Sequence, residues 1–132
     1  MGVTKLVGIV LVSHSRELAQ GLADLASQVA GPEVRIEPAG GGPEGTLGTS
    51  GSTVGDAIAR ADSGAGVVVL ADLGSAVLTV KDVVRDRFNG RVRLIDAPFV
   101  EGAIAAAVVS AAGLSLEDVA RAGEEARGAR KL

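Results

Sequence analysis

The sequence predicts an α/β protein: an open, four-stranded, mainly parallel sheet with helices on both faces, in three layers. Two observations predict it. Short runs of β-branched and other apolar residues alternate along the chain with longer segments of helical periodicity. The short runs are apolar throughout, as in strands that are buried on both faces. The resulting order β-α-β-α-β-α-β-α-α requires crossover connections, which are right-handed. We expect all 132 residues to form one domain.

The strands and helices follow from these patterns in order. The predicted strands are residues 6–12, 34–38, 66–71 and 91–95. Five helices are predicted between and after them, because apolar residues recur there on one helix face. These residues are Leu18, Leu22, Leu25 and Val29; Val54, Ile58 and Ala61; Val80, Val83, Val84 and Phe88; Ile104, Val108 and Ala111; and Leu116, Val119, Ala120 and Ala126.

Capping residues mark the ends of these helices. Serine and threonine at the start of a helix accept hydrogen bonds from its free N–H groups, and glycine ends a helix. The expected first caps are Ser15, then Ser52 or Thr53, then Ser75. Ser115 followed by Asp118 resembles a capping box. The expected ends are Gly31-Pro32, Asn89-Gly90 and Gly113 for the first, third and fourth helices.

Composition excludes several classes of protein. Apolar residues make up 47% of the chain, which is too many for a disordered protein. There is no cysteine and only one histidine, so neither disulfides nor a structural zinc site are expected. The net charge of −3, without a basic block, argues against nucleic-acid binding. No apolar run approaches the roughly 20 residues of a membrane span, and residues 1–8 do not resemble a signal peptide. We therefore expect a cytoplasmic protein that contacts no membrane.

The predicted topology indicates where a ligand would bind. In open parallel sheets, ligands bind beyond the carboxyl ends of the strands, where the strand order reverses. The polar or glycine-rich segments 13–15, 39–52, 72–75 and 96–98 all follow predicted strands. They should therefore gather at one edge of the sheet.

His14 is the residue most suited to chemistry at this edge. A histidine there can be a base, a metal ligand or a nucleophile. A metal would need further ligands, such as Asp72 and Asp96, and three well-placed ligands are not evident. As a nucleophile, the neutral ring can attack phosphorus, and the nearby helix start offers N–H groups to a phosphate. If the first and third strands are neighbours, Asp72 lies beside His14 and fixes its tautomer. Otherwise Asp72 merely interacts with the dipole of a helix.

Glycines and hydroxyls supply candidate phosphate contacts. Gly74 allows close backbone approach, and Ser75 either caps a helix or binds phosphate. The stretch from 39 to 52 lacks the lysine of a nucleotide-binding P-loop. Its backbone N–H groups and hydroxyls, including those of Gly40, Gly41 and Thr49, can still line an anion site. The alternative is a flexible loop. For Glu101, which opens the fourth helix, an interaction with the helix dipole is a sufficient role.

Five motifs in order resemble a known family. They are GIVLVSHS from Gly8, AGG from Ala39, GTS from Gly48, ADLGSA from Ala71 and DAPFVEGA from Asp96. Together they are similar to the phosphoryl-carrier subunit of the phosphotransferase-system-dependent dihydroxyacetone kinase, itself related to the IIA domain of mannose-type sugar permeases. The resemblance covers residues 3–126 and implies the mannose-type IIA fold.

The resemblance also implies a mechanism and partners. His14 would be the phosphorylated nucleophile and Asp72 the residue that orients it. The donor would be phospho-HPr, which enzyme I charges from phosphoenolpyruvate. The acceptor would be ADP on the nucleotide-binding subunit of the kinase, so that Mg-ADP or Mg-ATP belongs to that partner and this chain binds neither cofactor nor metal. The resulting ATP would phosphorylate dihydroxyacetone. The family forms homodimers.

The sequence is compatible with three interpretations of the function. The first is the carrier, a phosphotransferase with a phosphohistidine intermediate. The second is the IIA component of a mannose-family sugar permease, which passes its phosphate to a IIB domain. The third is a non-catalytic regulatory module that binds an anion or a protein. Some family members carry HPr-like and enzyme I-like domains behind the carrier domain. We expect this chain to use separate HPr, although the sequence leaves open that such domains once followed.

Overall fold

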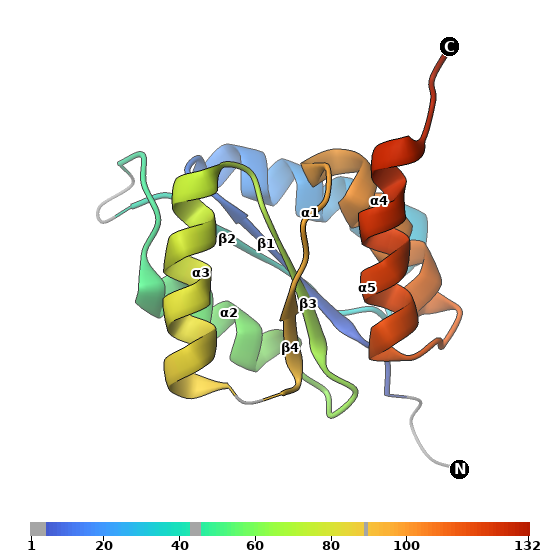
Figure 1. Ribbon diagram of the computed structural model, residues 1–132, viewed down its shortest axis with the longest axis horizontal. Coiled ribbons are helices and arrows are strands. Elements are labelled where there is room, and N and C mark those ends of the chain that lie inside the picture. The colour runs from blue at the N-terminus through green and yellow to red at the C-terminus, as the bar shows by residue number, and fades with distance from the viewer. Residues whose placement is uncertain (1–4, 43–45, 89) are drawn as a thin grey trace.

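The computed structural model describes residues 5–42, 46–88 and 90–132 (Figure 1). Its elements follow the predicted order. The strands in this part of the chain are β1 (Gly8–Ser13), β2 (Ile36–Gly40), β3 (Val67–Ala71) and β4 (Val92–Leu94). The helices are α1 (Arg16–Ala30), α2 (Gly51–Ala61), α3 (Gly74–Arg87), α4 (Phe99–Ala111) and α5 (Leu116–Glu125), followed by the short 3-10 helix η2 (Ala126–Gly128).

The strands form one sheet in the order β2-β1-β3-β4, and every pair is parallel. The chain moves from β1 to β2 on one side and then returns to place β3 on the other side. The strand order therefore reverses between β1 and β3, where Val12 pairs with Ala71. The predicted parallel sheet is confirmed. The predicted bounds of β2 are wrong by two residues, because Pro38 lies inside this edge strand, where a missing N–H is tolerated.

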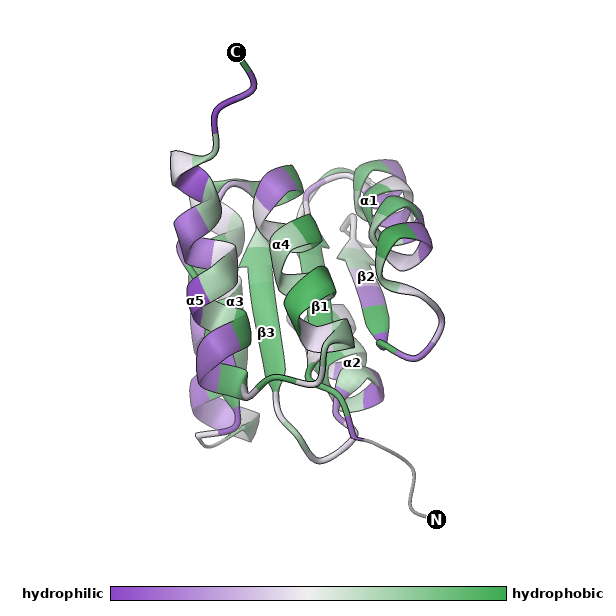
Figure 2. Cartoon of the chain, turned by 90° about the vertical axis from the view of Figure 1, so that its right-hand side faces the viewer, coloured by the Kyte–Doolittle hydropathy of each residue, from purple (hydrophilic) through white to green (hydrophobic). Residues whose placement is uncertain are grey.

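Helices cover both faces of the sheet, as predicted. Figure 2 shows α1, α4 and α5 in front of the sheet, while α2 and α3 lie behind it. Alternate residues of β1 serve the two layers: Ile9 and Leu11 belong to the core under α1, α4 and α5, and Val10 and Val12 to the core under α2 and α3. All six residues of β1 are buried. This central strand is thus packed from both sides, and His14 follows directly after it.

Two helices bury a different face from the one predicted. In α1, Leu18, Leu25 and Val29 are exposed, and α4 likewise exposes Val108. Of the predicted positions, Leu22 is buried in α1 and Ile104 is partly buried against the core in α4. The other buried positions hold small residues: Ala19, Ala23 and Ala26 in α1, and Gly102, Ala103, Ala106, Ala107 and Ser110 in α4. Small side chains let a helix lie close to the sheet, and this close packing decides the face. The predicted positions Val54, Ile58, Ala61, Val80, Val83, Val119 and Ala120 are buried as expected.

The helix caps agree with the prediction in part. Ser15 and Ser115 accept N–H bonds at the starts of α1 and α5, and Gly31 follows α1, all as predicted. The cap of α2 is Ser50, so the prediction of Ser52 or Thr53 is wrong by two or three residues. Ser75 caps nothing, because α3 already begins at Gly74 after Leu73, and its hydroxyl is used elsewhere. Phe88 follows α3, and Asn89, predicted to end it, lies outside the described residues.

Gly8 gives a test of this packing. A Cβ atom at Gly8 would lie 2.1 Å from the carbonyl oxygen of Ala61, so backbone would have to move. We expect Gly8→Ala to lower the free energy of unfolding in urea by about 3 kcal/mol. Gly21→Ala is the control, because a Cβ there meets nothing within 4 Å on α1; it should raise that free energy by about 1 kcal/mol. Equal effects of the two substitutions would contradict the packing described.

Candidate functional site

The reversal of strand order brings His14 and Asp72 together. His14 follows the last residue of β1, and Asp72 follows the last residue of β3. The backbone N–H of Asp72 donates to the carbonyl of Val12 at 3.0 Å, which continues the pairing of the two strands into the site. The predicted proximity of the two side chains is therefore confirmed, although 58 positions separate them in the sequence.

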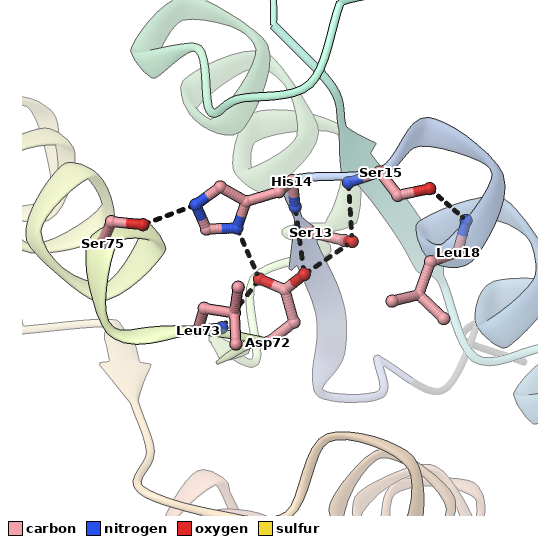
Figure 3. A network of polar contacts seen from close by, with 7 residues as sticks. All are labelled: Ser13, His14, Ser15, Leu18, Asp72, Leu73 and Ser75. Atoms are coloured by element: carbon pink, nitrogen blue, oxygen red, sulfur yellow. Dashed lines mark hydrogen bonds and ion pairs between the residues drawn. The ribbon is translucent and has the colours of Figure 1, made fainter.

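The carboxylate of Asp72 accepts four hydrogen bonds (Figure 3). Its Oδ1 lies 3.0 Å from Nδ1 of His14 and accepts the N–H of Leu73 at 2.7 Å. Its Oδ2 accepts the hydroxyl of Ser13 at 2.8 Å and the backbone N–H of His14 at 3.1 Å. The Asp72 side chain is only 12% exposed. Two oxygens with about four lone-pair positions are thereby filled, which fixes the plane of the carboxylate.

These bonds keep Asp72 ionised. Burial raises the pKa of Asp72, but the hydrogen bonds from the side chains of His14 and Ser13 and from the N–H groups of His14 and Leu73 lower it, and the net pKa lies below the usual 3.8. An ionised carboxylate can only accept hydrogen bonds. We therefore assign the proton of the neutral His14 ring to Nδ1, which leaves the lone pair on Nε2.

The second nitrogen of His14 faces Ser75. Nε2 lies 2.5 Å from Oγ of Ser75, so this hydroxyl donates to the Nε2 lone pair. The His14 side chain is 24% exposed, and Figure 3 shows the ring between Asp72 on one side and Ser75 on the other. Ser75 and Gly74 are the first two residues of α3, and N–H groups at this position have no partner inside the helix. Nε2 thus faces the N-terminus of α3.

The backbone around His14 is held by its neighbours in the sequence. Ser15 caps α1 by accepting the N–H of Leu18 at 3.2 Å, so the helix begins two residues after His14. The N–H of Ser15 in turn donates to Oγ of Ser13 at 3.0 Å. The residues on both sides of His14 are therefore locked, and the imidazole starts from a fixed backbone.

The glycine-rich segment after β2 lies against this backbone. The N–H of Gly41 donates to the carbonyl of Ser13, and the N–H of Gly48 donates to the carbonyl of His14, each at 3.1 Å. A Cβ at Gly40 would lie 2.7 Å from the carbonyl oxygen of Ser15, so a glycine is needed for this close approach. Oγ1 of Thr49 is buried and has no partner among the described residues. The segment thus supports His14, and phosphate contacts from Gly40, Gly41 and Thr49 stay a prediction.

Other residues considered from the sequence lie outside this cluster. Asp96 pairs with Arg127 at 3.2 Å, and Glu101 pairs with Lys131 at 2.7 Å. Within residues 5–42, 46–88 and 90–132, no three His, Cys, Asp or Glu side chains gather where they could hold a metal ion. None of the helices in those ranges is both long enough and apolar enough to cross a membrane.

Sequence reasoning missed the role of Ser13. Its hydroxyl is fully buried and donates to the carboxylate of Asp72. A signal was present: Ile9, Leu11 and Ser13 form one row on β1, and the last of them is polar where an apolar residue is expected. A polar side chain in a buried row must find a partner, and here the partner is Asp72.

Comparison with known proteins identifies relatives of the whole site-bearing region. The family model EIIA-man, described as "PTS system fructose IIA component", matches residues 8–120. The phosphoryl donor subunit DhaM of a PEP-dependent dihydroxyacetone kinase from Listeria innocua is 35% identical over 117 residues, covering 86% of this chain and 94% of that protein. DhaM from Escherichia coli is also 35% identical, over 120 residues, but this chain covers only 25% of it.

Solved structures support the same fold. The crystal structure of unknown function protein EF1359 superposes with a TM-score of 0.79 at 33% identity, covering 90% of this chain and 93% of that one. A sigma-54 interaction domain protein from Enterococcus faecalis has a TM-score of 0.69 at 18% identity and shares the fold. The resemblance drawn from the five sequence motifs is thereby confirmed.

The ionisation of Asp72 gives the site a measurable pH dependence. Because its pKa is lower in the folded chain than the usual 3.8, the ionised carboxylate stabilises the fold above that pH, and this contribution is lost as the pH falls through the folded pKa. We expect a carbon-detected NMR titration to place the pKa of Asp72 below 3.8. The free energy of unfolding of Asp72→Asn should consequently fall less steeply on acidification than that of the unaltered protein.

A control separates this effect from the loss of a charge alone. Asp82 lies on the exposed surface of α3, where its side chain is 66% exposed, and Asp82→Asn removes a carboxylate far from His14. At acidic pH, the free energy of unfolding of Asp82→Asn should follow that of the unaltered protein more closely than the free energy of unfolding of Asp72→Asn does. The same loss of unfolding free energy on acidification in both variants would contradict the role assigned to Asp72.

Proposed function

This chain belongs to the family of PTS system fructose IIA components, and from that premise we propose that it is a phosphoryl carrier with its phosphoryl group on Nε2 of His14. One observation carries the proposal. Asp72 lies 3.0 Å from Nδ1 and directs the ring proton there, so the lone pair of the partly exposed ring is on Nε2, at the carboxyl edge of the sheet, where it accepts only the hydroxyl of Ser75. A neutral imidazole prepared in this way is a nucleophile for phosphorus.

The transfer steps conserve the proton on Nδ1. In the first step the Nε2 lone pair attacks the phosphorus of a phosphorylated donor; the Nε2–P bond forms, the donor–P bond breaks, and its electron pair leaves with the donor. The ring then carries positive charge, which the ionised Asp72 stabilises from 3.0 Å. In the second step an acceptor oxygen attacks phosphorus, and the electrons of the Nε2–P bond return to Nε2. Asp72 thus orients His14 without taking its proton.

The start of α3 supplies contacts for the bound phosphoryl group. Once Nε2 is bonded to phosphorus it no longer accepts the hydroxyl of Ser75, which can then donate to a phosphoryl oxygen. The N–H groups of Gly74 and Ser75 open a 14-residue helix whose dipole favours an anion. No atom lies within 4 Å of the position that a Cβ would take at Gly74, so the backbone is open there. Gly40 and Thr49, whose Oγ1 has no partner among the described residues, complete the proposed set, whereas the N–H of Gly41 is already bonded to the carbonyl of Ser13.

The names of two relatives support a role as phosphoryl donor to a kinase. Relatives from Listeria innocua and Escherichia coli are named phosphoryl donor subunits of PEP-dependent dihydroxyacetone kinases. We assign the same role here: the donor is phospho-HPr, and the acceptor is ADP on the nucleotide-binding subunit of the kinase. Mg-ADP or Mg-ATP is then held by that subunit, and this chain carries no cofactor of its own. The proposal includes that the carrier works as a homodimer and in the cytoplasm.

The charges around His14 suit a group that must leave again. The described side chains that bond the His14–Asp72 pair are the hydroxyls of Ser13 and Ser75, and neither is a cation. A carrier that clamped phosphate with arginine or lysine would release it slowly. Hydroxyls and N–H groups hold it less strongly. Transfer to ADP should therefore need the cations and Mg²⁺ that the partner brings to the complex.

The mass of the intact protein tests the carrier directly. We expect one phosphoryl group to be added after incubation with phosphoenolpyruvate, enzyme I and HPr, to be lost in acid, and to be absent from His14→Ala, because the Nε2–P bond needs the imidazole. Addition of the kinase subunits with ADP should then discharge the protein. An unchanged mass in the presence of HPr that has itself been phosphorylated would contradict the carrier and favour a binding module.

A second acceptor separates the two transfer functions. The family model that matches is named EIIA-man and described as a PTS system fructose IIA component. The IIA component of a mannose-family permease is therefore the specific alternative. Discharge of the phosphorylated protein by a IIB domain, and none by the kinase subunits with ADP, would favour the permease component. Discharge by the kinase subunits alone would favour the assignment made here.

A further inference from the structure

Ser13 is a buried polar residue at a position where an apolar side chain would also fit. It is the last residue of β1, it is 0% exposed, and it continues the row of Ile9 and Leu11 toward the core under α1, α4 and α5. An apolar side chain of similar size would fill this position without needing a hydrogen bond. A buried hydroxyl must be bonded, so its partners indicate what it does.

Those partners give the hydroxyl a direction. Oγ of Ser13 accepts the N–H of Ser15 at 3.0 Å and donates to Oδ2 of Asp72 at 2.8 Å. A serine hydroxyl has one proton, and the N–H of Ser15 occupies a lone pair on the other side of the oxygen. The proton of Ser13 therefore points to Asp72. The start of α1, which Ser15 caps, is thereby connected to the carboxylate.

The consequence for Asp72 is a fixed rotation about its Cβ–Cγ bond. Oδ2 is held by the Ser13 hydroxyl and by the N–H of His14, so Oδ1 is the oxygen left to face Nδ1 of His14. Without the Ser13 hydroxyl, Oδ2 would have one donor in place of two. The carboxylate could then turn, and its hold on the Nδ1 proton would weaken.

We propose that Ser13 is a positioning residue for phosphoryl transfer: it holds the Asp72 carboxylate in the plane that keeps the proton of His14 on Nδ1 and the lone pair on Nε2. Ser13 does not touch phosphorus and acts only through Asp72. The inference rests on the proposed function for its effect on rate. Its effect on the His14 tautomer stands without that function, because the tautomer is a property of the unphosphorylated chain.

Ser13→Ala tests the proposal, with Ser110→Ala as the matched control. Ser110 is also 0% exposed, but its hydroxyl donates to the carbonyl of Val7, before the start of β1. In nitrogen NMR spectra of the neutral His14 ring, the unaltered protein and Ser110→Ala should show Nδ1 protonated and Nε2 unprotonated. Ser13→Ala should show a mixture of the two tautomers, a change that a purely structural role would not produce.

The kinetics provide a second readout. With phosphoenolpyruvate, enzyme I and HPr, the maximal rate of His14 phosphorylation should fall about tenfold in Ser13→Ala, because a tautomer protonated on Nε2 cannot attack phosphorus and because a turned carboxylate stabilises the charged ring less well. The HPr concentration at half-maximal rate should stay unchanged, since Ser13 is buried and contacts no partner. Ser110→Ala should keep the original rate.

Each result decides the proposal. A Ser13→Ala variant that keeps the Nδ1 tautomer and the original rate would overturn it. Should that variant fail to fold, Ser13→Cys keeps nearly the same volume with a weaker donor, and the same two measurements apply with an intermediate effect expected. If the unaltered protein accepts no phosphoryl group, the proposed function fails, yet a tautomer mixture in Ser13→Ala would still support the positioning role.

Discussion

The ionised carboxylate of Asp72 is the constraint on which the site depends. It accepts four hydrogen bonds from residues that follow or end two neighbouring strands, and it decides which nitrogen of His14 carries the proton. That arrangement exists only while β1 and β3 are paired in parallel with Val12 opposite Ala71. A slip of one residue would turn Ser13 and the carboxylate to the wrong faces. The register of the sheet therefore determines the geometry of the site.

The core makes this register rigid. β1 is buried on both faces, with α1, α4 and α5 on one side and α2 and α3 on the other. Close packing of small residues, such as Ala19 against the backbone of Gly40, brings the glycine-rich segment up to His14. The backbone of His14 is thereby fixed, and the described side chains that bond the His14–Asp72 pair are hydroxyls. In the proposed carrier, such a site favours acceptance and release of a phosphoryl group over its retention.

Much of this could be predicted from the sequence, because position along a parallel sheet is a local signal. His14 and Asp72 each follow an apolar run, and the topology places the ends of those runs together. The buried faces of α1 and α4 could not be predicted in this way, because alanine and glycine carry little hydrophobic signal although they pack closest to the sheet. Capping is one of two roles that the sequence allows for Ser75; its hydroxyl instead bonds Nε2 of His14, which lies 61 positions away. Local patterns contain no information about such contacts.

The central claim is that Asp72 leaves Nε2, and only Nε2, free to form the bond to phosphorus. The most direct measurement is the phosphorus–nitrogen coupling in NMR spectra of the nitrogen-labelled protein after phosphorylation. The account predicts that phosphorus couples to Nε2 of His14 while Nδ1 keeps its proton beside Asp72. Phosphorus bonded to Nδ1 would contradict it, because the carboxylate occupies that side of the ring at 3.0 Å.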